Sequence, residues 1–317
     1  MELLDQLKEK IKERLPELDV VIGWEQGFDP LHATPLFMRT EEDVDRLVFS
    51  PLCVHNLASH LTGLKGKKVG IVVKGCDSRS VVELLQEKLL VREDVTVFGL
   101  PCTGVVSLKK IKHALGGLDK VASAEFNGNE LKVSAAGAAR VLPLNEIAAD
   151  KCGRCQYHNA LLSDVFVGAP VEEAAEDNYA DVEAFQAKSP QEQAAYWRDA
   201  MQRCLRCYAC RNACPMCVCR DHCVAQSREP HWMTQQDTVQ EKWFFQMIHA
   251  LHLAGRCTEC GECERACPVG IPLLLLKRKI NKEIKELFDY QAGTKIDATP
   301  PLLSFKVEEE NINERGW

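Results

Sequence analysis

The chain has 317 residues, 46% of them hydrophobic, and a formal net charge of −7. Its length is enough for two domains of ordinary size, each with a core of its own. The acidic balance excludes a general nucleic-acid binder, and no apolar stretch approaches the roughly 20 residues that cross a bilayer. The charged start of the chain lacks the basic and apolar regions of a signal peptide, so we expect a cytoplasmic protein without a membrane span.

Patterns of strand and helix alternate along the first 170 residues. Continuous apolar runs indicate strands buried on both faces of a sheet, and apolar residues at a period near 3.6 indicate helices. We expect strands at 18–23, 67–73 and 95–98, helices at 1–15, 80–90 and 105–115, and a hairpin of 120–126 with 131–134. The alternation predicts an α/β N-terminal domain, 1–170, with an open mixed sheet.

One loop of this domain lies where open α/β sheets bind ligands, between the strand at 67–73 and the next helix. Helix N-termini favour anions, so the loop is a candidate contact for the phosphate of a flavin or a nucleotide. No G-x-G-x-x-G fingerprint accompanies it, and an ordinary turn with solvated charges is the alternative. The candidate contacts are Lys74, Gly75, Asp77, Ser78 and Arg79, with Asp77 or Ser78 as the N-cap of the helix.

The second half of the chain has a different character. An acidic stretch, 171–190, is predicted to be a linker with a solvated face, and 191–293 to be a mainly helical domain. Helices are expected from 191 to about 204 and over 238–253, and the last helix carries an apolar stripe that we expect to face the core. The stripe is Leu276, Ile280, Ile284, Leu287 and Phe288. Prolines and charges predict an extended tail at 294–317.

Two cysteine runs share the spacing C-x-x-C-x-x-C-x-x-x-C-P, with which bacterial two-cluster ferredoxins hold cubane 4Fe–4S clusters. Because the fourth cysteine of such a run ligates the other cluster, the ligand sets are expected to cross. We predict that cluster 1 is held by Cys204, Cys207, Cys210 and Cys267, and cluster 2 by Cys257, Cys260, Cys263 and Cys214. Structural zinc also accepts four thiolates, but two complete runs with trailing prolines favour iron–sulfur.

Eight further cysteines complete a total of sixteen, and disulfides are rare in the cytoplasm. Cys76 and Cys102 each follow a predicted strand, and Cys152 and Cys155 form a C-x-x-C pair. Because neighbouring strand ends converge in an α/β sheet, Cys76, Cys102, Cys152 and Cys155 are candidate ligands of a third cluster. The alternatives are zinc or a redox dithiol at the C-x-x-C pair and small buried hydrophobes at Cys76 and Cys102.

Three more cysteines follow the first run within seven residues. Cys217, Cys219 and Cys223 are candidate ligands of a fourth cluster, with Cys53 or His222 as the fourth ligand. The alternative is individual packing. The cofactors predicted from the residues are therefore two 4Fe–4S clusters, and four at most.

These motifs and several shorter segments resemble the beta-subunit family of deazaflavin-reducing hydrogenases and formate dehydrogenases, over the chain up to about Gly293. The N-terminal matches are Ala33–Phe37, Lys67–Asp77, Leu100–Cys102, Lys151–Cys155 and Ser163–Gly168, and the ferredoxin-type matches are Arg203–Pro215 and Ala254–Ile271. The resemblance implies FAD in the N-terminal domain and 4Fe–4S clusters beyond it. At Ser50–Cys53 the chain has a cysteine where the family carries a flavin-proximal Ser-Lys-Tyr-like segment.

We therefore expect an iron–sulfur electron-transfer subunit of a multisubunit oxidoreductase. It would relay single electrons between a partner dehydrogenase or hydrogenase, formate dehydrogenase-like, and a flavin or a heterodisulfide-reductase-like module. One alternative is an FAD-containing oxidoreductase that acts directly on a nicotinamide or deazaflavin cofactor. Another is an interaction protein stabilised by zinc. No catalytic motif of an independent enzyme is visible in the sequence.

Overall fold

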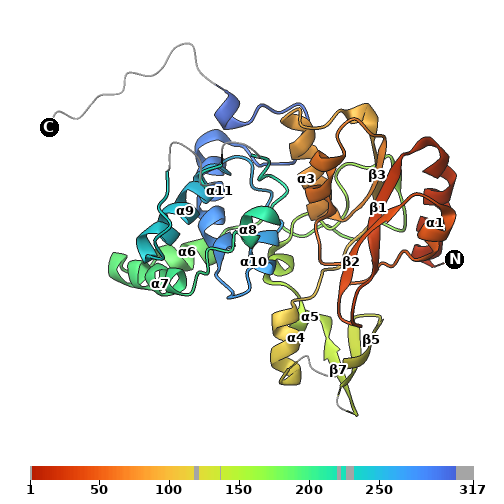
Figure 1. The fold of residues 1–317 in the computed structure, drawn as a ribbon, viewed down its shortest axis with the longest axis horizontal. Coiled ribbons are helices and arrows are strands. Elements are labelled where there is room, and N and C mark those ends of the chain that lie inside the picture. The colour runs from red at the N-terminus through yellow and green to blue at the C-terminus, as the bar shows by residue number, and fades with distance from the viewer. Residues whose placement is uncertain (1, 118–120, 136, 220–222, 226–231, 305–317) are drawn as a thin grey trace.

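The computed structural model describes residues 2–117, 121–135, 137–219, 223–225 and 232–304. An α/β part built on a mixed sheet lies at one end, a helical part lies at the other, and a small antiparallel sheet projects beside them (Figure 1). The predicted combination of an α/β N-terminal region and a helical C-terminal region is confirmed. The predicted domain boundaries remain predictions.

The main sheet has five strands in the order β2-β1-β3-β4-β8. β1 pairs antiparallel with β2, whereas β1 with β3, β3 with β4, and β4 with β8 are parallel pairs. The strands are β1 Val20–Gln26, β2 Ala33–Met38, β3 Val69–Val73, β4 Val95–Gly99 and β8 Val165–Phe166. All five residues of β3 are buried, as its continuous apolar run predicts for a central parallel strand.

Three helices share a hydrophobic core with this sheet: α1 Leu3–Arg14, α2 Glu41–Asp45 and α3 Gly75–Gln86. The predicted cap of α3 is wrong, because the helix begins at Gly75 and Lys74 is its N-cap. Asp77 is the third helical residue after this N-cap, and its carboxylate accepts a hydrogen bond from the backbone N–H of Lys74, as in a capping box. The C-terminal ends of β3 and β4 therefore lead directly to Cys76 and Cys102.

The small sheet consists of β5 Val121–Asn127, β6 Glu130–Ala135 and β7 Ala138–Pro143, packed with α4 Leu108–Leu115 and α5 Leu144–Ile147. The predicted hairpin is confirmed by the antiparallel pairing of β5 with β6 around Gly128, whose φ of +58° suits glycine. Lys120, the first residue of the predicted hairpin, lies outside the described residues. Ser107 caps α4 by accepting a hydrogen bond from the backbone of Lys110, so that the helix begins three residues later than predicted.

The helical part runs through α6 Ala180–Gln186, α7 Pro190–Gln202, α8 Ala209–Asn212, α9 Val239–Leu251, α10 Glu262–Arg265 and α11 Leu273–Phe288. The apolar stripe predicted to face the core on α11 is wrong. Leu287 and Phe288 are 70% and 55% exposed, whereas the buried face includes Lys277 and Arg278. A helix of the described chain thus turns two cations inward, which requires compensating negative groups.

Arg278 finds such groups in the acidic stretch. Its guanidinium forms ion pairs with Asp177, Asp181 and Glu259, and it lies over the ring of Tyr179. The prediction of a solvated linker is therefore wrong for these two aspartates, because they fasten the stretch to α11. The tail beyond residue 304 lies outside the described residues, and a short 3₁₀ turn, Pro301–Leu303, precedes that point.

A second arginine joins the α/β part to the helical part. Arg79 of α3 donates hydrogen bonds to the carbonyls of Thr258 and Ala292, and its guanidinium lies 4.7 Å from the centre of the Tyr157 ring. Across the same boundary, Arg256 pairs with Glu87. Within the described part of the chain, no helix has the length and apolar character that a membrane crossing needs.

Glu83, at this boundary, gives the stability a testable pH dependence. Burial and the neighbouring Glu87 raise the pKa of Glu83 to about 8; one oxygen accepts a bond from the N–H of Gly293 and the other is unpartnered. The folded protein therefore holds this proton at pH values where the unfolded chain has lost it. We expect stability to fall as pH rises towards 8, by up to about 1.4 kcal/mol per unit.

Glu83→Gln should flatten this dependence, because glutamine cannot ionise. The measurement is the anaerobic unfolding temperature at pH 6 and pH 8, with Glu130→Gln, a change of an exposed carboxylate, as the control. An unfolding temperature that falls equally in both variants between the two pH values would contradict the assignment.

Candidate metal centres

The two cysteine runs fold into loops of the same backbone shape. In the first run Arg206 and Tyr208 have φ of +52° and +57°, and in the second Glu259 and Gly261, at the equivalent positions, have φ of +57° and +75°. Each loop then enters a one-turn helix, α8 or α10, that carries the third cysteine. The left-handed backbone at these positions turns each loop so that its first three cysteines face a common point.

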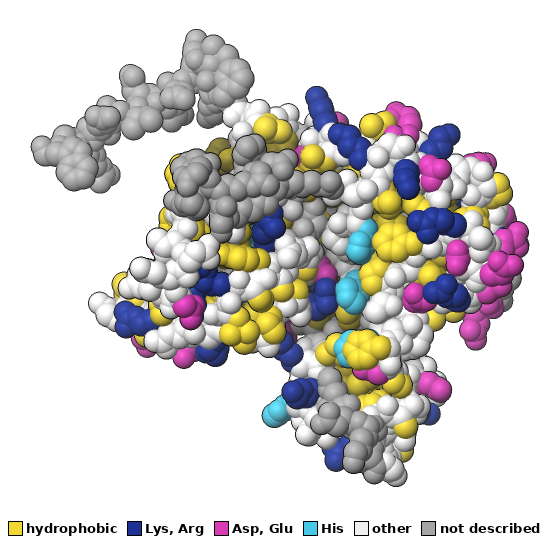
Figure 2. All heavy atoms as spheres, in the orientation of Figure 1, with side chains coloured by type: hydrophobic (Ala, Val, Ile, Leu, Met, Phe, Trp, Pro, Cys, Tyr) yellow, Lys and Arg dark blue, Asp and Glu magenta, His cyan; other side chains and the backbone are white. Residues whose placement is uncertain are grey.

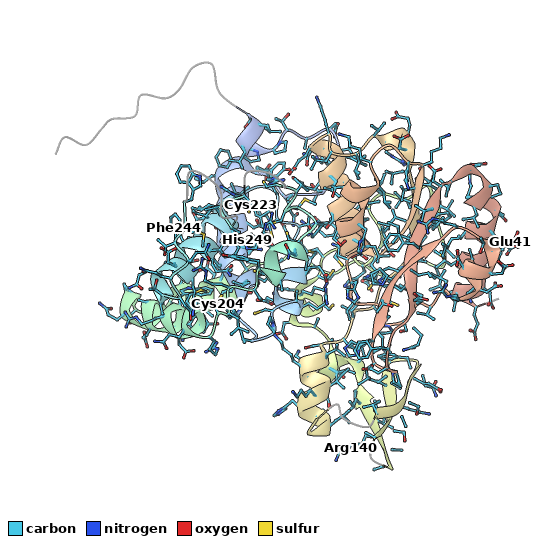
Figure 3. The ribbon with its side chains drawn as sticks, viewed as in Figure 1. Glu41, Arg140, Cys204, Cys223, Phe244 and His249 are labelled. Atoms are coloured by element: carbon cyan, nitrogen blue, oxygen red, sulfur yellow. The ribbon has the colours of Figure 1, made fainter. Side chains whose placement is uncertain are left out.

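The first candidate centre lies in the helical part, where Figure 3 labels Cys204. Its cavity is lined by Cys204, Cys207, Cys210 and Cys267, together with Phe245, Gln246 and Ile271. The thiol of Cys267 thus lies with three thiols of the other run. The Cys267 sulfur also accepts a hydrogen bond from the N–H of Ile271, 3.3 Å away. The structure brings together the four residues predicted for cluster 1; their ligation of iron remains a prediction.

The second candidate centre is deeper. Burial raises the pKa of Cys260 to about 11 and that of Cys263 to about 12, and the nearby Cys214 thiol adds to both shifts. Burial also raises the pKa of Cys257, with contributions from Cys260 and Cys263. Each of the four thiols predicted for cluster 2 thus affects the pKa of another or has its own pKa affected by another, and their ligation of iron remains a prediction. Burial disfavours free thiolates at Cys257, Cys260 and Cys263, whereas hydrogen bonds with Cys217 and His249 lower the pKa of Cys214. A metal would hold the first three sulfurs deprotonated.

Lys277 supplies the charge that such a centre requires. Its side chain is 3% exposed, and its Nζ lies 3.4 Å from Nε2 of His249. Among the described residues no carboxylate pairs with it; the thiols of Cys263, Cys214 and Cys257 raise its pKa instead. A buried ammonium without a counter-charge is costly. Four thiolates on a cubane leave net negative charge, so the residues present fit a 4Fe–4S cluster.

The third candidate centre lies where β3 and β4 end. Cys76, Cys102, Cys152 and Cys155 line one cavity, which Lys74, Arg79 and Lys151 also line. The sulfur of Cys152 accepts a hydrogen bond from the N–H of Val105, 3.3 Å away. The convergence expected from the sheet thus occurs, and the cluster itself remains a prediction.

Lys151 connects this cavity to the second centre. Its Nζ lies 4.0 Å from the sulfur of Cys76 and donates a hydrogen bond to the carbonyl of Cys260. Burial opposes the charge of this lysine, but the thiols of Cys76 and Cys152 outweigh it and raise the pKa. One half-buried cation therefore lies between two neighbouring groups of cysteines.

The residues predicted to contact a flavin or a nucleotide form ion pairs and hydrogen bonds with other groups of the protein. Lys74 forms a buried ion pair with Asp77 at 2.7 Å and lies over Trp24. The hydroxyl of Ser78 donates to the carbonyl of Gly75, and a Cβ on Gly75 would lie 1.9 Å from the carbonyl oxygen of Tyr157. The segment 155–159 thus covers this end of α3, and Arg79 is tied to the helical part. Lys74, Gly75 and Arg79 also line the cavity of the third centre, and contact with a flavin or a nucleotide there remains a prediction.

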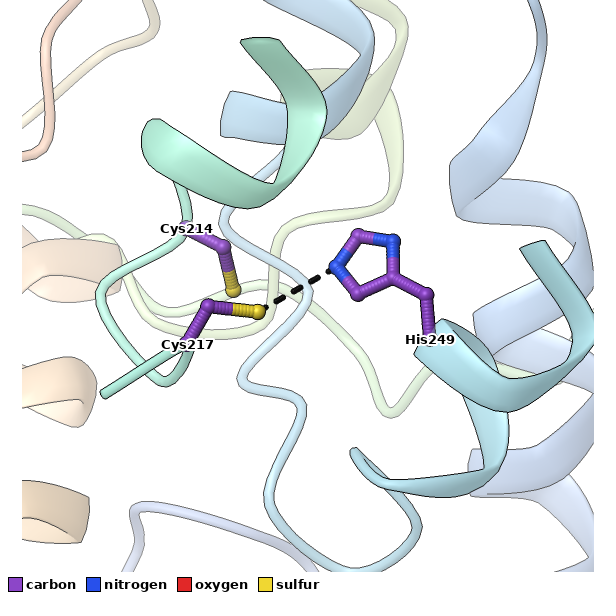
Figure 4. Close-up of side chains that lie close together, drawn as sticks. All are labelled: Cys214, Cys217 and His249. Atoms are coloured by element: carbon purple, nitrogen blue, oxygen red, sulfur yellow. Dashed lines mark hydrogen bonds between the residues drawn. The ribbon is translucent and has the colours of Figure 1, made fainter. Parts of the chain in front are cut away.

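Of the cysteines predicted for a fourth cluster, Cys53 and Cys217 have partners of their own, whereas Cys219 and Cys223 share Arg211. The Cys53 thiol lies in the core of the α/β part, 3.7 Å from the carbonyl of Val48. Cys217 lies beside Cys214, and its sulfur is 3.3 Å from Nε2 of His249 (Figure 4). Arg211 contacts the other two, through the Cys223 sulfur and the Cys219 carbonyl. His222 lies outside the described residues, and the fourth set remains a prediction.

A cleft of about 420 Å³ lies beside the second and third centres. The side chains that line it include His32 and His55 from the α/β part and Arg265 from the second cysteine loop, with Lys109 and Lys151 between them. Burial lowers the pKa of His55 to about 4, and its Nδ1 has no partner. The volume is in the range of small-molecule sites.

Comparison with known protein families gives one match that begins in the α/β part and one in the helical part. Residues 66–189 match the family described as the C terminus of the coenzyme F420 hydrogenase/dehydrogenase beta subunit, and residues 200–271 match the 4Fe–4S dicluster domain. The two matched segments follow one another along the chain, and neither covers half of it. The first match spans the four cysteines of the third centre, and the second spans both ferredoxin-type runs.

Two curated relatives extend the likeness over most of the chain. The F420-dependent formate dehydrogenase subunit beta of Methanocaldococcus jannaschii is 24% identical over 348 residues, covering 91% of this chain and 90% of the relative. The F420-dependent formate dehydrogenase 1 subunit beta of Methanococcus maripaludis is 22% identical over 347 residues, covering 90% and 89%. The resemblance to the beta-subunit family is confirmed.

A solved F420-reducing [NiFe] hydrogenase complex from Methanosarcina barkeri also matches, with 19% identity and a TM-score of 0.36. The match covers 49% of this chain and 62% of that one. This likeness is too low to bear on the fold.

The sequence interpretation missed Lys151, Lys277 and His249. A signal existed for Lys277, which lies three residues after Leu274 and four after Leu273, on the face that the structure buries. A charged residue at helical spacing from leucines is ordinarily taken for the edge of an apolar face. Its function becomes apparent only when the facing sulfurs are known.

Removing this charge gives a second prediction. Lys277→Gln should lower the reduction potential of the buried cluster, because a neutral amide no longer stabilises the added electron. At an effective dielectric constant of about 20 the loss is on the order of 1–2 kcal/mol, or about 40–80 mV for one electron. The measurement is a redox titration followed by electron paramagnetic resonance.

Lys279→Gln, on the same helix, is the matched control, because Lys279 pairs with Glu283 at the surface. Its potentials should equal those of the wild type. Equal potentials in Lys277→Gln, with iron content unchanged, would sink the electrostatic interpretation of Lys277.

Proposed function

We propose that this chain is the iron–sulfur electron-transfer subunit of a multisubunit oxidoreductase. It relays single electrons between a partner dehydrogenase or hydrogenase, formate dehydrogenase-like, and a flavin or a heterodisulfide-reductase-like module. The observation that carries this proposal is the crossing of the two runs: Cys267 lies with the first run and Cys214 with the second. Crossed thiols of this kind are the ligand arrangement of two adjacent cubanes.

The three candidate centres form a sequence through the molecule. The third lies at the edge of the main sheet, and Lys151 joins it to the loop of the second. The second shares its cysteine runs with the first, in the helical part. We assign one cluster to each centre. Twelve of the sixteen cysteines are then ligands, and four cysteines lie outside the three centres. The residues around each cube hold and desolvate it and set its potential; electron movement is the chemistry that the clusters supply.

The partner assignment has separate support. The relatives that cover about nine-tenths of the chain are named as beta subunits of F420-dependent formate dehydrogenases. A subunit whose buried groups are thiols, lysines and arginines, without a recognised catalytic motif, suits a relay within such a complex. A cytoplasmic location belongs to the same proposal, since reduced thiols are the rule there.

A flavoenzyme is the second candidate, and the cleft of about 420 Å³ favours it. Lys151 lines both this cleft and the cavity of the third centre, so an isoalloxazine bound there would lie next to a cluster. Such a flavin would convert hydride pairs into single electrons. Anaerobic purification with flavin quantified per chain separates the candidates: about one flavin supports the flavoenzyme and none supports the relay.

The cluster assignment makes a third prediction. At four irons per cubane the anaerobically purified chain should contain about 12 iron and 12 acid-labile sulfide. Cys76→Ala should reduce both to about 8, because the third centre loses a ligand. Cys53→Ala is the matched control and should leave iron unchanged, because Cys53 lies in the core of the α/β part.

Other iron contents would favour other assignments. A wild-type content of about 16 iron, falling in Cys53→Ala, would restore the fourth cluster instead. A protein that contains zinc and no iron, or whose reduced form gives no cluster signal in electron paramagnetic resonance, would refute the relay.

A further inference from the structure

One cluster ligand reaches the surface. Of the eight thiols in the two ferredoxin-type runs, Cys207 alone is exposed; six others are buried and Cys214 is half-buried. Cys207 lines the cavity of the first centre with Cys204, Cys210 and Cys267. Electron tunnelling falls steeply with distance, so a cluster in that cavity exchanges electrons most readily across the surface at Cys207.

The surface around Cys207 is apolar at its centre. Leu205, two residues before it, is 63% exposed, and Tyr196 on α7 is 38% exposed. Tyr196 stacks edge-on against Trp197, which packs on the core that contains Cys204 and Cys210. Figure 2 shows hydrophobic side chains gathered over the helical part, with lysines and arginines among them. A large exposed leucine beside an exposed cluster ligand is suited to contact with a partner.

The charges around this centre are positive, in contrast with the net charge of −7. From 198 to 219 the chain has four arginines (198, 203, 206 and 211) and one carboxylate, Asp199. Asp199 is paired with Arg203. Arg206 donates its hydrogen bonds to the carbonyls of Gln236 and Thr234, and carbonyls do not neutralise a guanidinium.

Few carboxylates lie beside these arginines among the described residues: Glu241 accepts a hydrogen bond from the N–H of Thr234, and Glu264 lies near Tyr196. Asp237, near Arg206 in space through Gln236, forms an ion pair with Lys242. Acidic side chains instead gather at the far end of the molecule over α1 and α2, where Figure 3 labels Glu41 (Figures 2 and 3). Arginines therefore outnumber carboxylates in the segment that carries the one exposed ligand of the two runs.

We infer that the surface formed by Tyr196, Arg203, Leu205, Arg206 and Cys207 is the docking site of a small acidic redox protein with its own one-electron centre near its surface. Opposite charge steers the encounter, and the apolar centre excludes water at contact. Transient electron-transfer complexes bury less than about 1,200 Å², so such a complex needs no large apolar interface. One electron passes from the reduced carrier to the oxidised first cluster; the carrier is oxidised and the cluster reduced by that electron.

The inference rests on the proposed electron-transfer function, and a kinetic experiment separates the two. A reduced acidic plant-type ferredoxin is mixed with the oxidised, cluster-loaded full chain in a stopped-flow instrument, and cluster bleaching is followed. Arg203→Glu should reduce the second-order rate constant about tenfold at low ionic strength. Lys65→Glu changes the net charge equally, from −7 to −9, at an exposed site on the α/β part, and should leave the rate within about twofold.

A second variant tests the apolar centre of the surface, and its iron content shows whether it still folds around its clusters. Leu205→Ser keeps the charge and should reduce the rate several-fold while iron content stays at the wild-type value. The wild-type rate should also fall as salt rises from about 20 to about 300 mM, since the Debye length shrinks. Reduced methyl viologen, a small cation, should reduce all variants as fast as the wild type.

Two outcomes overturn the inference: equal rates in Arg203→Glu and Lys65→Glu, or a rate that does not depend on salt. A wild-type chain that viologen cannot reduce would instead refute the electron-transfer function itself.

Discussion

The exchange of one cysteine between two loops is the constraint on which the helical part depends. Cys214 and Cys267 each leave their own run and lie with the other. Two loops separated by about 40 residues of chain must therefore come together, and α9 spans the interval while α11 closes the far side. The equivalent left-handed residues in both loops, and the one-turn helices that follow, show one local solution used twice.

Charge compensation is the second consequence of gathering thiols in the interior. Burial alone raises thiol pKa values, so each group of sulfurs needs cations close by to remain ionised. Lys277 stands beside the second group and Lys151 between the second and the third. Lys277 is buried and Lys151 is half-buried, and they lie among sulfurs, a carbonyl and an imidazole. These lysines explain why a helix and a loop turn cations towards the core, and they make charge a determinant of cluster potential.

The junction between the α/β part and the helical part follows from the same need. Arg79, Arg256 and Arg278 each cross between segments far apart in the chain and pair there with carbonyls or carboxylates. This places the ends of β3 and β4 against the second cysteine loop. The three centres also differ in the exposure of their thiols. The thiols of the second centre are enclosed, whereas one thiol of the first centre, Cys207, reaches solvent.

Local information in the sequence determined much of this protein. The spacing of the runs, the buried strands and the Asn-Gly turn depend on neighbouring residues, and the structure contains the corresponding loops, strands and hairpin. Cys76 and Cys102 could be grouped because parallel neighbours end at one edge of a sheet. Tertiary structure alone decided which charged residues turn inward: Lys277, Lys151 and Arg278 have the sequence character of surface residues. Asp77 and Arg79 follow a strand in a turn where solvated charges are ordinary, yet both are buried with partners. The reason is physical, since a charge is stable inside only where opposite charge or hydrogen-bond partners meet it, and distant segments supplied them here.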